Sequence, residues 1–190
     1  MKRKPNLFKL ILQLQKAHSH NLGFLPKQAI EQYIERQQVN IATLNDEACG
    51  YILWRDRSKP LWFESETHER TILQACIATD ARRRQRCTEA LRQLAFEAIS
   101  AGKTTLALWS GSTLESNQFW RDVGFQVTGR RIGSVHHHPV HLRWSLDLTL
   151  TTPEQIGTPA PARNSLYIPP WFPSGRSRHR IPRMWLHGTA

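Results

Sequence analysis

The sequence predicts an α+β, or mixed α/β, fold with a central mixed sheet flanked by helices. Segments with an apolar residue every three or four positions alternate with short β-branched segments, and the longest helical segment lies between two apolar strands. The chain has 190 residues, which suits one domain and a tail. We expect a domain over residues 1–150 and a basic, weakly ordered tail, which contains Pro and Arg, over residues 151–190.

The first half of the predicted domain contains two helices and a hairpin. Apolar residues at helical spacing predict a helix over Leu25–Gln37 and an amphipathic helix over Leu7–Gln15, for which a strand–helix edge is the alternative. Val39–Leu44 and Cys49–Trp54 are predicted strands that flank a polar turn, so they should form a hairpin. The short apolar segment Leu61–Phe63 is expected to pair with the next strand.

The second half alternates strands and helices. The β-branched and apolar run Thr71–Thr79 predicts a strand, and the apolar stripe that follows predicts a helix over Asp80–Ser100, ended by Gly102. The same patterns predict a strand at Thr104–Trp109, a helix at Leu114–Val123 and strands at Phe125–Ile132 and His141–Leu150.

Charge and cysteine content limit the partners. The net charge of +11 favours anionic partners, which are nucleic acid, anionic lipid headgroups or phosphate-bearing cofactors. Three cysteines, Cys49, Cys76 and Cys87, lack the spacing of metal ligands, so reduced thiols in a cytoplasmic protein are expected. No apolar run is long enough to cross a membrane and no secretory segment is found, so no membrane partner is expected.

The segment between the central strand and the long helix carries the main functional motif. It reads Ile77-Ala78-Thr79-Asp80-Ala81 and then Arg82-Arg83-Arg84-Gln85-Arg86-Cys87. A helix N-terminus offers unpaired N–H groups and partial positive charge, so it binds phosphates. Arginines there oppose the helix dipole by about 0.3–1 kcal/mol each. Four of them favour a bound pyrophosphate or nucleic-acid phosphate, and the alternative is a basic helix start exposed to solvent.

This motif and a later one resemble the GNAT superfamily of N-acetyltransferases. In that family a strand is followed by Arg or Gln, two residues, Gly, one residue, and Gly or Ala at the start of a helix. The family's later segment has Asn or Ala, an aromatic pair, three residues and Gly-Phe, and Ser116–Phe125 is similar to it. The resemblance covers roughly residues 25–150 and implies a divergent GNAT member.

The resemblance implies an enzyme that moves an acetyl group from acetyl-CoA to an amine. It implies that Arg82–Cys87 hold the pyrophosphate and that the backbone of Cys76–Ala78 splays from the adjacent strand and receives the pantetheine arm. Asn117 and Trp120 would border the arm and the thiol. The implied cofactor-binding residues are Cys76, Ile77, Ala78, Arg82, Arg83, Arg84, Gln85, Arg86, Cys87, Asn117 and Trp120.

Three positions depart from the family's pattern. Gln85 and Cys87 stand where the family has small residues, and glycine lets a backbone approach phosphates closely. The Gln85 side chain either hinders this approach or hydrogen-bonds the phosphate. Trp120 stands where the family usually has a Tyr proposed to protonate the leaving thiolate, and an indole N–H is a very poor acid. Core packing is the alternative role of Trp120, and a degenerate catalyst is the alternative to an active one.

Acetyl transfer also needs a base that deprotonates the acceptor ammonium. Glu64, Glu66 and His68 precede the central strand, near where related enzymes place carboxylates, and each is a candidate. A polar loop is the alternative. The arginines around Cys87 should lower its thiol pKa, but the sequence identifies no base that would make it a nucleophile.

Two further segments carry alternatives. His136 and His138 share one face of a strand and could ligate a metal, but no Cys or acidic partner lies near, so a His-rich hairpin loop is preferred and no metal is predicted. The tail combines arginine with aromatic residues, a mixture that binds nucleic acid, and its alternative is a solvated tail. The arginines concerned are Arg163, Arg176, Arg178, Arg180 and Arg183.

The rival function is therefore a nucleic-acid-binding or phage-type DNA-base-modifying protein on the same fold, with weak or no acetyl-CoA activity. The high charge, the basic tail and the missing glycines favour it. The acceptor, whether a small molecule or a macromolecule, and the oligomeric state are not encoded in any motif that we identify.

Overall fold

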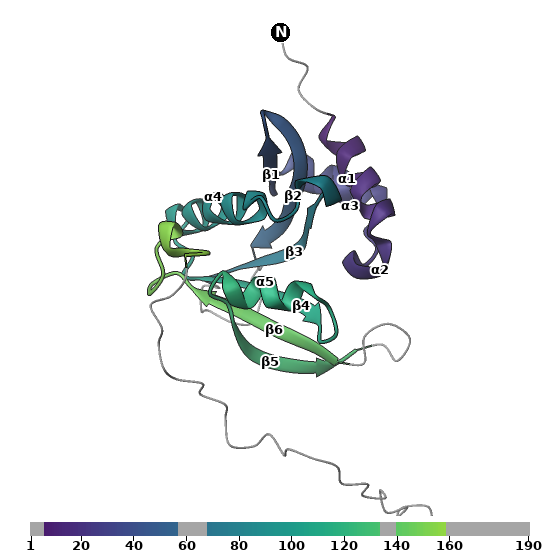
Figure 1. The fold of residues 1–190 in the computed structure, drawn as a ribbon. Helices are drawn as coiled ribbons and strands as arrows, with labels where there is room; N and C mark the ends of the chain where they lie inside the picture. Colours follow the sequence, from purple (N-terminus) through teal and green to yellow (C-terminus); the bar gives the residue numbers. More distant parts are fainter. Residues whose placement is uncertain (1–5, 57–67, 134–139, 159–190) are drawn as a thin grey trace, which may run out of the picture. The chain divides into compact units, whose positions relative to one another are not determined.

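The computed structural model describes residues 6–56, 68–133 and 140–158, and Figure 1 shows the arrangement of their elements. The helices are α1 (Leu7–Ala17), α2 (Ser19–Leu22), α3 (Lys27–Glu35), α4 (Arg86–Ser100) and α5 (Ser116–Asp122), with 3-10 turns η1 (Thr79–Ala81) and η2 (Pro153–Gln155). The strands are β1 (Val39–Leu44), β2 (Glu47–Asp56), β3 (Glu69–Ile77), β4 (Thr105–Gly111), β5 (Gln126–Ile132) and β6 (Val140–Asp147). This order confirms the predicted α+β class.

The six strands form one mixed sheet in the order β1-β2-β3-β4-β6-β5. The neighbours β1–β2, β2–β3, β4–β6 and β5–β6 are antiparallel, whereas β3 and β4 are parallel. Two parallel neighbours need a crossover connection, and α4 supplies it. The predicted hairpin β1–β2 and the predicted mixed sheet are therefore confirmed.

Helices cover both faces of the half of the sheet formed by β1, β2 and β3 (Figure 1). On one face, Ile11 of α1 and Ile30 of α3 pack with Leu53 of β2 in one buried cluster. On the other face, Leu94 of α4 packs with Ile52 of β2 in a second buried cluster. The alternation of side chains along β2 thus divides the core into two layers.

Two predicted boundaries differ from the structure. α4 begins at Arg86 and not at Asp80, because Arg83 and Gln85 have φ of 59° and cannot belong to a right-handed helix. β6 ends at Asp147 and not at Leu150, because the Asp147 carboxylate accepts the Thr149 N–H at 2.8 Å and turns the chain. The short helix α2 has no counterpart in the predicted elements.

The packed unit also continues beyond the boundary expected at residue 150. Ile156 is completely buried in the cluster around α4, and its carbonyl accepts a hydrogen bond from Arg92 Nε at 3.0 Å. The first residues of the expected tail therefore belong to the domain. The predicted segment Leu61–Phe63 and the tail from residue 159 onward lie outside the described residues. Among the helices that the structure describes, none has the length and apolar character needed to span a bilayer.

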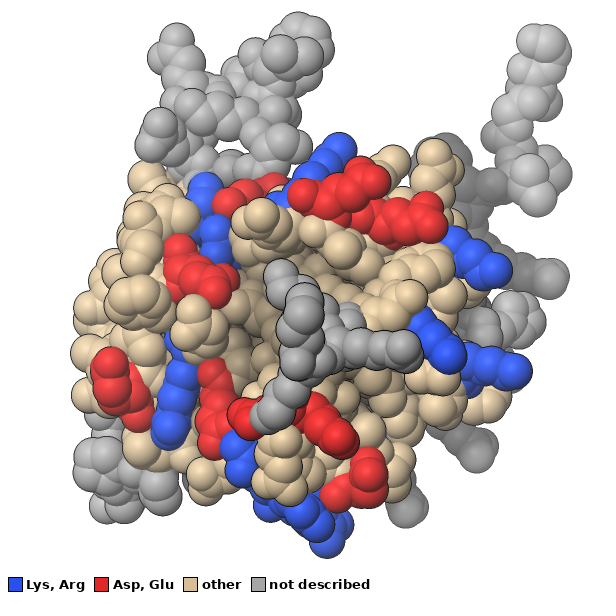
Figure 2. All heavy atoms as spheres, turned by 90° about the horizontal axis from the view of Figure 1, so that it is seen from above, with Lys and Arg blue, Asp and Glu red and all other residues tan. Residues whose placement is uncertain are grey.

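Charges of both signs are distributed over the described surface. Of the 26 Lys and Arg, 16 lie in the described ranges, as do 13 of the 15 Asp and Glu. Figure 2 shows acidic and basic side chains interspersed on the face seen from above. Most of the net charge of +11 therefore comes from residues outside the described ranges.

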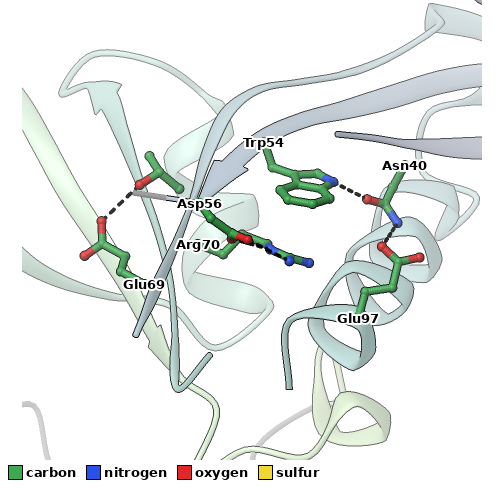
Figure 3. Close-up of polar contacts among 7 residues, drawn as sticks. Asn40, Trp54, Asp56, Glu69, Arg70 and Glu97 are labelled. Carbon is green, nitrogen blue, oxygen red and sulfur yellow. Dashed lines mark hydrogen bonds and ion pairs between the residues drawn. The ribbon is translucent and has the colours of Figure 1, made fainter. Parts of the chain in front are cut away.

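A buried polar cluster joins α4 to the first three strands (Figure 3). Arg70 is 3% exposed, donates to both carboxylate oxygens of Asp56 at 2.9 and 3.2 Å, and lies 3.7 Å from the Trp54 ring centroid. Trp54 Nε1 donates to Asn40 Oδ1 at 2.7 Å, and Asn40 Nδ2 donates to Glu97 Oε2 at 3.0 Å. These contacts fix α4 on the sheet at the end where β3 begins.

Candidate active site

The parallel strands β3 and β4 run side by side at first and then separate. Their pairing ends at Ile72 of β3 and Leu108 of β4. Beyond that point β3 stays paired with β2 as far as Ile77, and β4 stays paired with β6 as far as Gly111. The sheet therefore opens between the carboxyl ends of two neighbouring strands, and their backbones border the opening.

A β-bulge in β3 lies where this opening begins. Leu53 and Trp54 are consecutive on β2, but their partners on β3 are Gln74 and Ile72. Leu73 is therefore an extra residue on β3. A bulge bends its strand and increases the local twist, which directs the end of β3 away from β4.

The bulge also changes which side chains face α4. Ile72 and Ile77 both pack in the cluster around α4, whereas Cys76 packs with α1 and α3. Residues five positions apart lie on opposite faces of a regular strand. The extra residue between Ile72 and Ile77 restores them to the same face.

The last peptide group of β3 points its carbonyl away from β2. The Ala78 N–H donates to the Cys49 carbonyl of β2 at 2.8 Å. Since N–H and C=O point in opposite directions across a trans peptide, the Ile77 carbonyl is directed away from β2, toward the opening. It accepts a hydrogen bond from Arg82 Nε at 3.3 Å.

Gly50 of β2 makes the close approach of this peptide possible. A Cβ on Gly50 would lie 2.4 Å from Ile77 Cδ1 and 2.5 Å from the Cys76 carbonyl oxygen. Any side chain at this position would displace the end of β3, so the position requires glycine.

The chain turns sharply between β3 and α4. After η1, Arg83 and Gln85 both have φ of 59°, a left-handed conformation that is uncommon for residues other than glycine. Gln85 is the residue immediately before α4. Gln85 therefore adopts a conformation that costs a glycine nothing but strains a residue with a side chain.

The N-terminus of α4 has hydrogen-bond donors without an acceptor in the helix. The Gln85 side chain makes no capping hydrogen bond, and the first hydrogen bond of the helix joins the Glu89 N–H to the Gln85 carbonyl at 3.0 Å. The N–H groups of Arg86, Cys87 and Thr88 come before Glu89 and therefore have no acceptor within the helix. Together with the positive end of the helix dipole, they form a site suited to an anion.

The arginine side chains of the turn surround this helix end. Arg82, Arg83 and Arg84 are exposed to solvent. Arg86 donates to Glu89 at 2.7 Å, but its Nε is buried and has no hydrogen-bond partner. A buried donor without an acceptor costs about 1–3 kcal/mol, and a bound anion would remove that cost.

His18 at the end of α1 also contacts the turn. Arg82 Nη2 lies 3.2 and 3.3 Å from the two ring nitrogens of His18. Burial, and secondly the charge of Arg82, lower the pKa of His18, so the ring is neutral at neutral pH and can accept a hydrogen bond. No local sequence pattern indicates this contact, because 64 positions separate the two residues.

Comparison with known proteins identifies this architecture. No protein-family model matches the sequence, and no curated protein matches it. Solved structures do match, although at low sequence identity. The ribosomal-protein-alanine N-acetyltransferase from Brucella melitensis has 17% identity and a TM-score of 0.58, and the match covers 75% of this chain and 93% of that one.

Two other matches cover a similar share of this chain. A GNAT-family protein from Chromobacterium violaceum has 17% identity and a TM-score of 0.57 over 76% of this chain and 84% of that one. The structure of yncA from Salmonella typhimurium with its cofactor acetyl-CoA has 16% identity and a TM-score of 0.59 over 75% of this chain and 86% of that one. This chain has the GNAT fold. The resemblance found in its sequence is thereby confirmed at the level of the fold.

In this GNAT fold, Asn117 fastens α5 to the end of β4. Its Nδ2 donates to the Gly111 carbonyl at 2.8 Å, and its Oδ1 accepts from the Ser110 hydroxyl at 2.5 Å. Trp144 Nε1 of β6 donates to the same hydroxyl at 2.9 Å. Asn117 thus holds one border of the opening in place. Sequence reasoning selected Asn117 but missed Ser110 and Trp144, which have no motif of their own.

Trp120 lies in the hydrophobic core. It is 5% exposed, and its ring makes edge-to-face contacts with Phe119 at 5.0 Å and with Phe125 at 5.3 Å between centroids. Such pairs add to the stabilisation that burial itself gives. The structure therefore favours the packing role of Trp120 over a role beside the thiol.

Cys87 does not have the properties of a nucleophile. It packs against the core, and burial raises its thiol pKa to about 12. The expectation that the arginines lower this pKa is wrong, because burial dominates. Cys76 is also buried, and its pKa is raised to about 11.

Of the three base candidates, the structure describes only His68. His68 precedes β3 at the end where β3 and β4 are paired, and its Nδ1 lies 3.4 Å from the Gly102 carbonyl beyond the C-terminus of α4. Four positions along β3 separate His68 from Ile72, where the pairing with β4 ends, about 13 Å at the usual rise per residue. The role of His68 as a base stays a prediction. Glu64 and Glu66 lie outside the described residues.

Other predicted residues also lie outside the described ranges. They include His136 to His138 and the arginines Arg163, Arg176, Arg178, Arg180 and Arg183. Within the described ranges, no group of three or more His, Cys, Asp or Glu side chains could hold a metal ion. The arrangement that remains is an opened pair of strands leading to an uncapped, arginine-lined helix.

Proposed function

We propose that this protein is an N-acetyltransferase that moves an acetyl group from acetyl-CoA to an amine of its acceptor. The observation that carries this proposal is the end of β3–β4 pairing at Ile72 and Leu108, beside the uncapped N-terminus of α4. A fold neighbour, yncA from Salmonella typhimurium, was solved with its cofactor acetyl-CoA. The residues of this chain fit such a cofactor.

The turn before α4 would bind the pyrophosphate. The N–H groups of Arg86, Cys87 and Thr88 would donate to phosphate oxygens, and the Arg82 and Arg84 guanidinium groups would add charge-assisted hydrogen bonds. The buried Nε of Arg86, which has no partner, supports this fit. The side chains would compensate for the missing glycines of the family's motif.

The opening would receive the pantetheine arm. The Ile77 carbonyl is directed toward the opening, and β3 and β4 no longer satisfy each other's backbone groups beyond Ile72 and Leu108. Acetyl-CoA would supply the activated thioester. The chain would contribute positioning of the amine beside the thioester. Asn117 would act indirectly, because its hydrogen bonds hold the border of the opening in place.

Acid–base assistance would come from residues other than Trp120. The indole is buried in the core and is a poor acid. Glu64, Glu66 and His68 stay predictions as bases for the acceptor ammonium. Catalysis would then depend mainly on positioning, with a smaller acid–base contribution.

Calorimetry and thermal shift with acetyl-CoA test the proposal. We expect saturable binding and a rise in Tm, since a ligand that binds only the folded state stabilises it. The double variant Arg82→Ala/Arg84→Ala should weaken binding about 10-fold to 100-fold, the effect of losing charge-assisted hydrogen bonds. Arg55→Ala is the matched control, because Arg55 is an exposed arginine at the other end of the β2–β3 pair.

Two outcomes would contradict the proposal. One is the absence of any acetyl-CoA binding, together with salt-sensitive binding of DNA, which would favour the nucleic-acid-binding rival. The other is equal loss of affinity in Arg55→Ala and in the double variant. The second outcome would show that the turn contributes only general positive charge.

A further inference from the structure

The sheet face opposite α4 and α5 carries basic and aromatic side chains beside the opening. Leu108 packs in the cluster around α4, so its neighbour Trp109 faces the other way. Arg143 of β6 is the partner of Trp109, and Arg131 of β5 is the partner of His141. Directly paired residues share a face, and so do residues two apart on one strand. All four of these side chains therefore lie on this face.

Trp109 and Arg131 form a stacked pair across the strand between them. The guanidinium carbon of Arg131 lies 4.4 Å from the centroid of the Trp109 ring. Trp109 Cη2 lies 4.0 Å from the position that a Cβ would take on Gly129, so the indole reaches over β6 to β5. Stacking holds the planar guanidinium with its donors in a fixed plane, which reduces the entropy lost when it binds an anion.

Positive charge on this face is uncompensated near the opening. Glu69 forms an ion pair with Arg143. Asp147 lies opposite Thr105 in the strand register, at the end of β4 far from the opening. No carboxylate in the described ranges pairs with Arg131, which is exposed. Trp109 directly follows the last β4 residue that pairs with β3, so its backbone borders the start of the opening, and Arg131 stacks on its ring from the β5 side.

We propose that the acceptor carries a carboxylate or a phosphate close to its amine, and that Arg131, stacked on Trp109, binds this group. The inference rests on the proposed acetyl transfer at the same opening. An arginine fork matches both anions because it donates two parallel hydrogen bonds to them. The same charge disfavours acceptors with several ammonium groups, such as polyamines, through like-charge repulsion.

Binding of matched amines tests this inference without relying on turnover. The probes are glycine against glycinamide, O-phosphoethanolamine against ethanolamine, and spermidine, titrated calorimetrically into the full chain with and without CoA. We expect at least one amine that carries a carboxylate or phosphate to bind about 10-fold or more tightly than its partner without that group. The pair that shows this preference distinguishes a carboxylate acceptor from a phosphate acceptor.

Two arginine variants assign the preference to a residue. Arg131→Gln should abolish it, whereas Arg130→Gln should keep it. Arg130 is the adjacent residue on β5, and its partner Leu142 packs against the core on the other face, so Arg130 is matched in charge and position but not in direction. In acetyl transfer followed by CoA release, Arg131→Gln should raise KM for the anionic amine and change kcat by less than about twofold.

The results separate this inference from the proposed function. If no amine with a carboxylate or phosphate is preferred, or if Arg131→Gln weakens both members of a pair equally, the inference is overturned while acetyl-CoA binding is unaffected. If acetyl-CoA does not bind, the proposed function fails, and the titrations without CoA still measure the anion preference of Arg131.

Discussion

The two ends of β3 lie in one strand but satisfy their polar groups differently. At the first end, Arg70 is bound to Asp56 and stacks on Trp54. At the other end, β3 separates from β4. The helix α4 that follows begins after Gln85, whose side chain makes no capping hydrogen bond. Both ends contain a buried arginine donor without a partner, on Arg70 and on Arg86.

The difference lies in what surrounds these two donors. Arg70 is 3% exposed and has a carboxylate partner for its other nitrogens, so its remaining donor is a local cost inside a packed cluster. Arg86 lies beside free helix N–H groups and exposed arginines, where an anion can reach it. The first end stabilises the fold, and the second end leaves donors unsatisfied, which fits the anion site that we propose. Changes at the two ends should therefore separate stability from affinity.

Arg70→Leu should have the largest effect on stability. It leaves the Asp56 carboxylate without its partner and removes the cation–π contact with Trp54. Breaking a buried ion pair costs about 3–5 kcal/mol, and the lower value applies here because the Asp56 side chain is 36% exposed. Urea unfolding measures the change, and acetyl-CoA affinity of the folded variant should stay within about twofold.

The double variant Arg70→Leu/Asp56→Asn is the control for this prediction. It should regain part of the lost stability, because no uncompensated charge remains. The comparison between the two ends fails if folded Arg70→Leu loses as much acetyl-CoA affinity as the Arg82→Ala/Arg84→Ala variant.

The pH dependence of stability should reveal how Cys76 is packed at the open end. Burial raises its folded-state pKa to about 11, above the value of 9.0 for an unperturbed thiol. A raised folded-state pKa gives stability that is complete below pH 9 and is lost as pH rises toward 11, by about 1.4 kcal/mol per pH unit. Urea unfolding at pH 7 to 10 should therefore show a smaller alkaline loss in Cys76→Ala than in the wild type. Parallel curves for the two proteins would show that Cys76 is not buried.

Gln85→Gly should produce the smallest effect on stability, and it has a matched control. A left-handed conformation costs a non-glycine residue about 1–2 kcal/mol, and glycine's extra chain entropy offsets about 0.5–1 kcal/mol of that. The free energy of unfolding should rise by up to about 1.5 kcal/mol. Acetyl-CoA should bind several-fold more tightly because the backbone can approach the phosphates.

Gln37→Gly is the control, since Gln37 has φ of 57° after α3 and lies away from the turn. It should gain similar stability without any change in affinity. An equal change in affinity for both variants would show that Gln85 does not face the cofactor.

The regular elements were predictable from the sequence because each has a periodic apolar pattern. β1, β2 and β4 are close to the predicted strands, and the turn at Arg82–Cys87 lies where the motif placed it. The start of α4 was not predictable, since neither Arg83 nor Gln85 is a glycine that would signal a left-handed residue. Ile156 was missed because a single apolar residue in a polar segment has no period, although it is fully buried.

The opening itself was predicted only through a resemblance, and its physical cause was not visible in the sequence. Leu73 continues an apolar run, so nothing in residue type marks it as an extra residue. Contacts such as that of His18 with Arg82 depend on tertiary packing between distant segments. Local patterns contain no information about such pairs.

The bulge at Leu73 has a consequence for how this strand can evolve. Replacing Leu73 by another apolar residue preserves the length of β3, and the side chains on both faces keep their neighbours. Deleting it would exchange the faces of every residue from Gln74 to Ile77, so that Cys76 would turn toward α4 and Ile77 away from it. Natural variation at this position should therefore consist of substitutions, while insertions and deletions in the strand should be eliminated by selection.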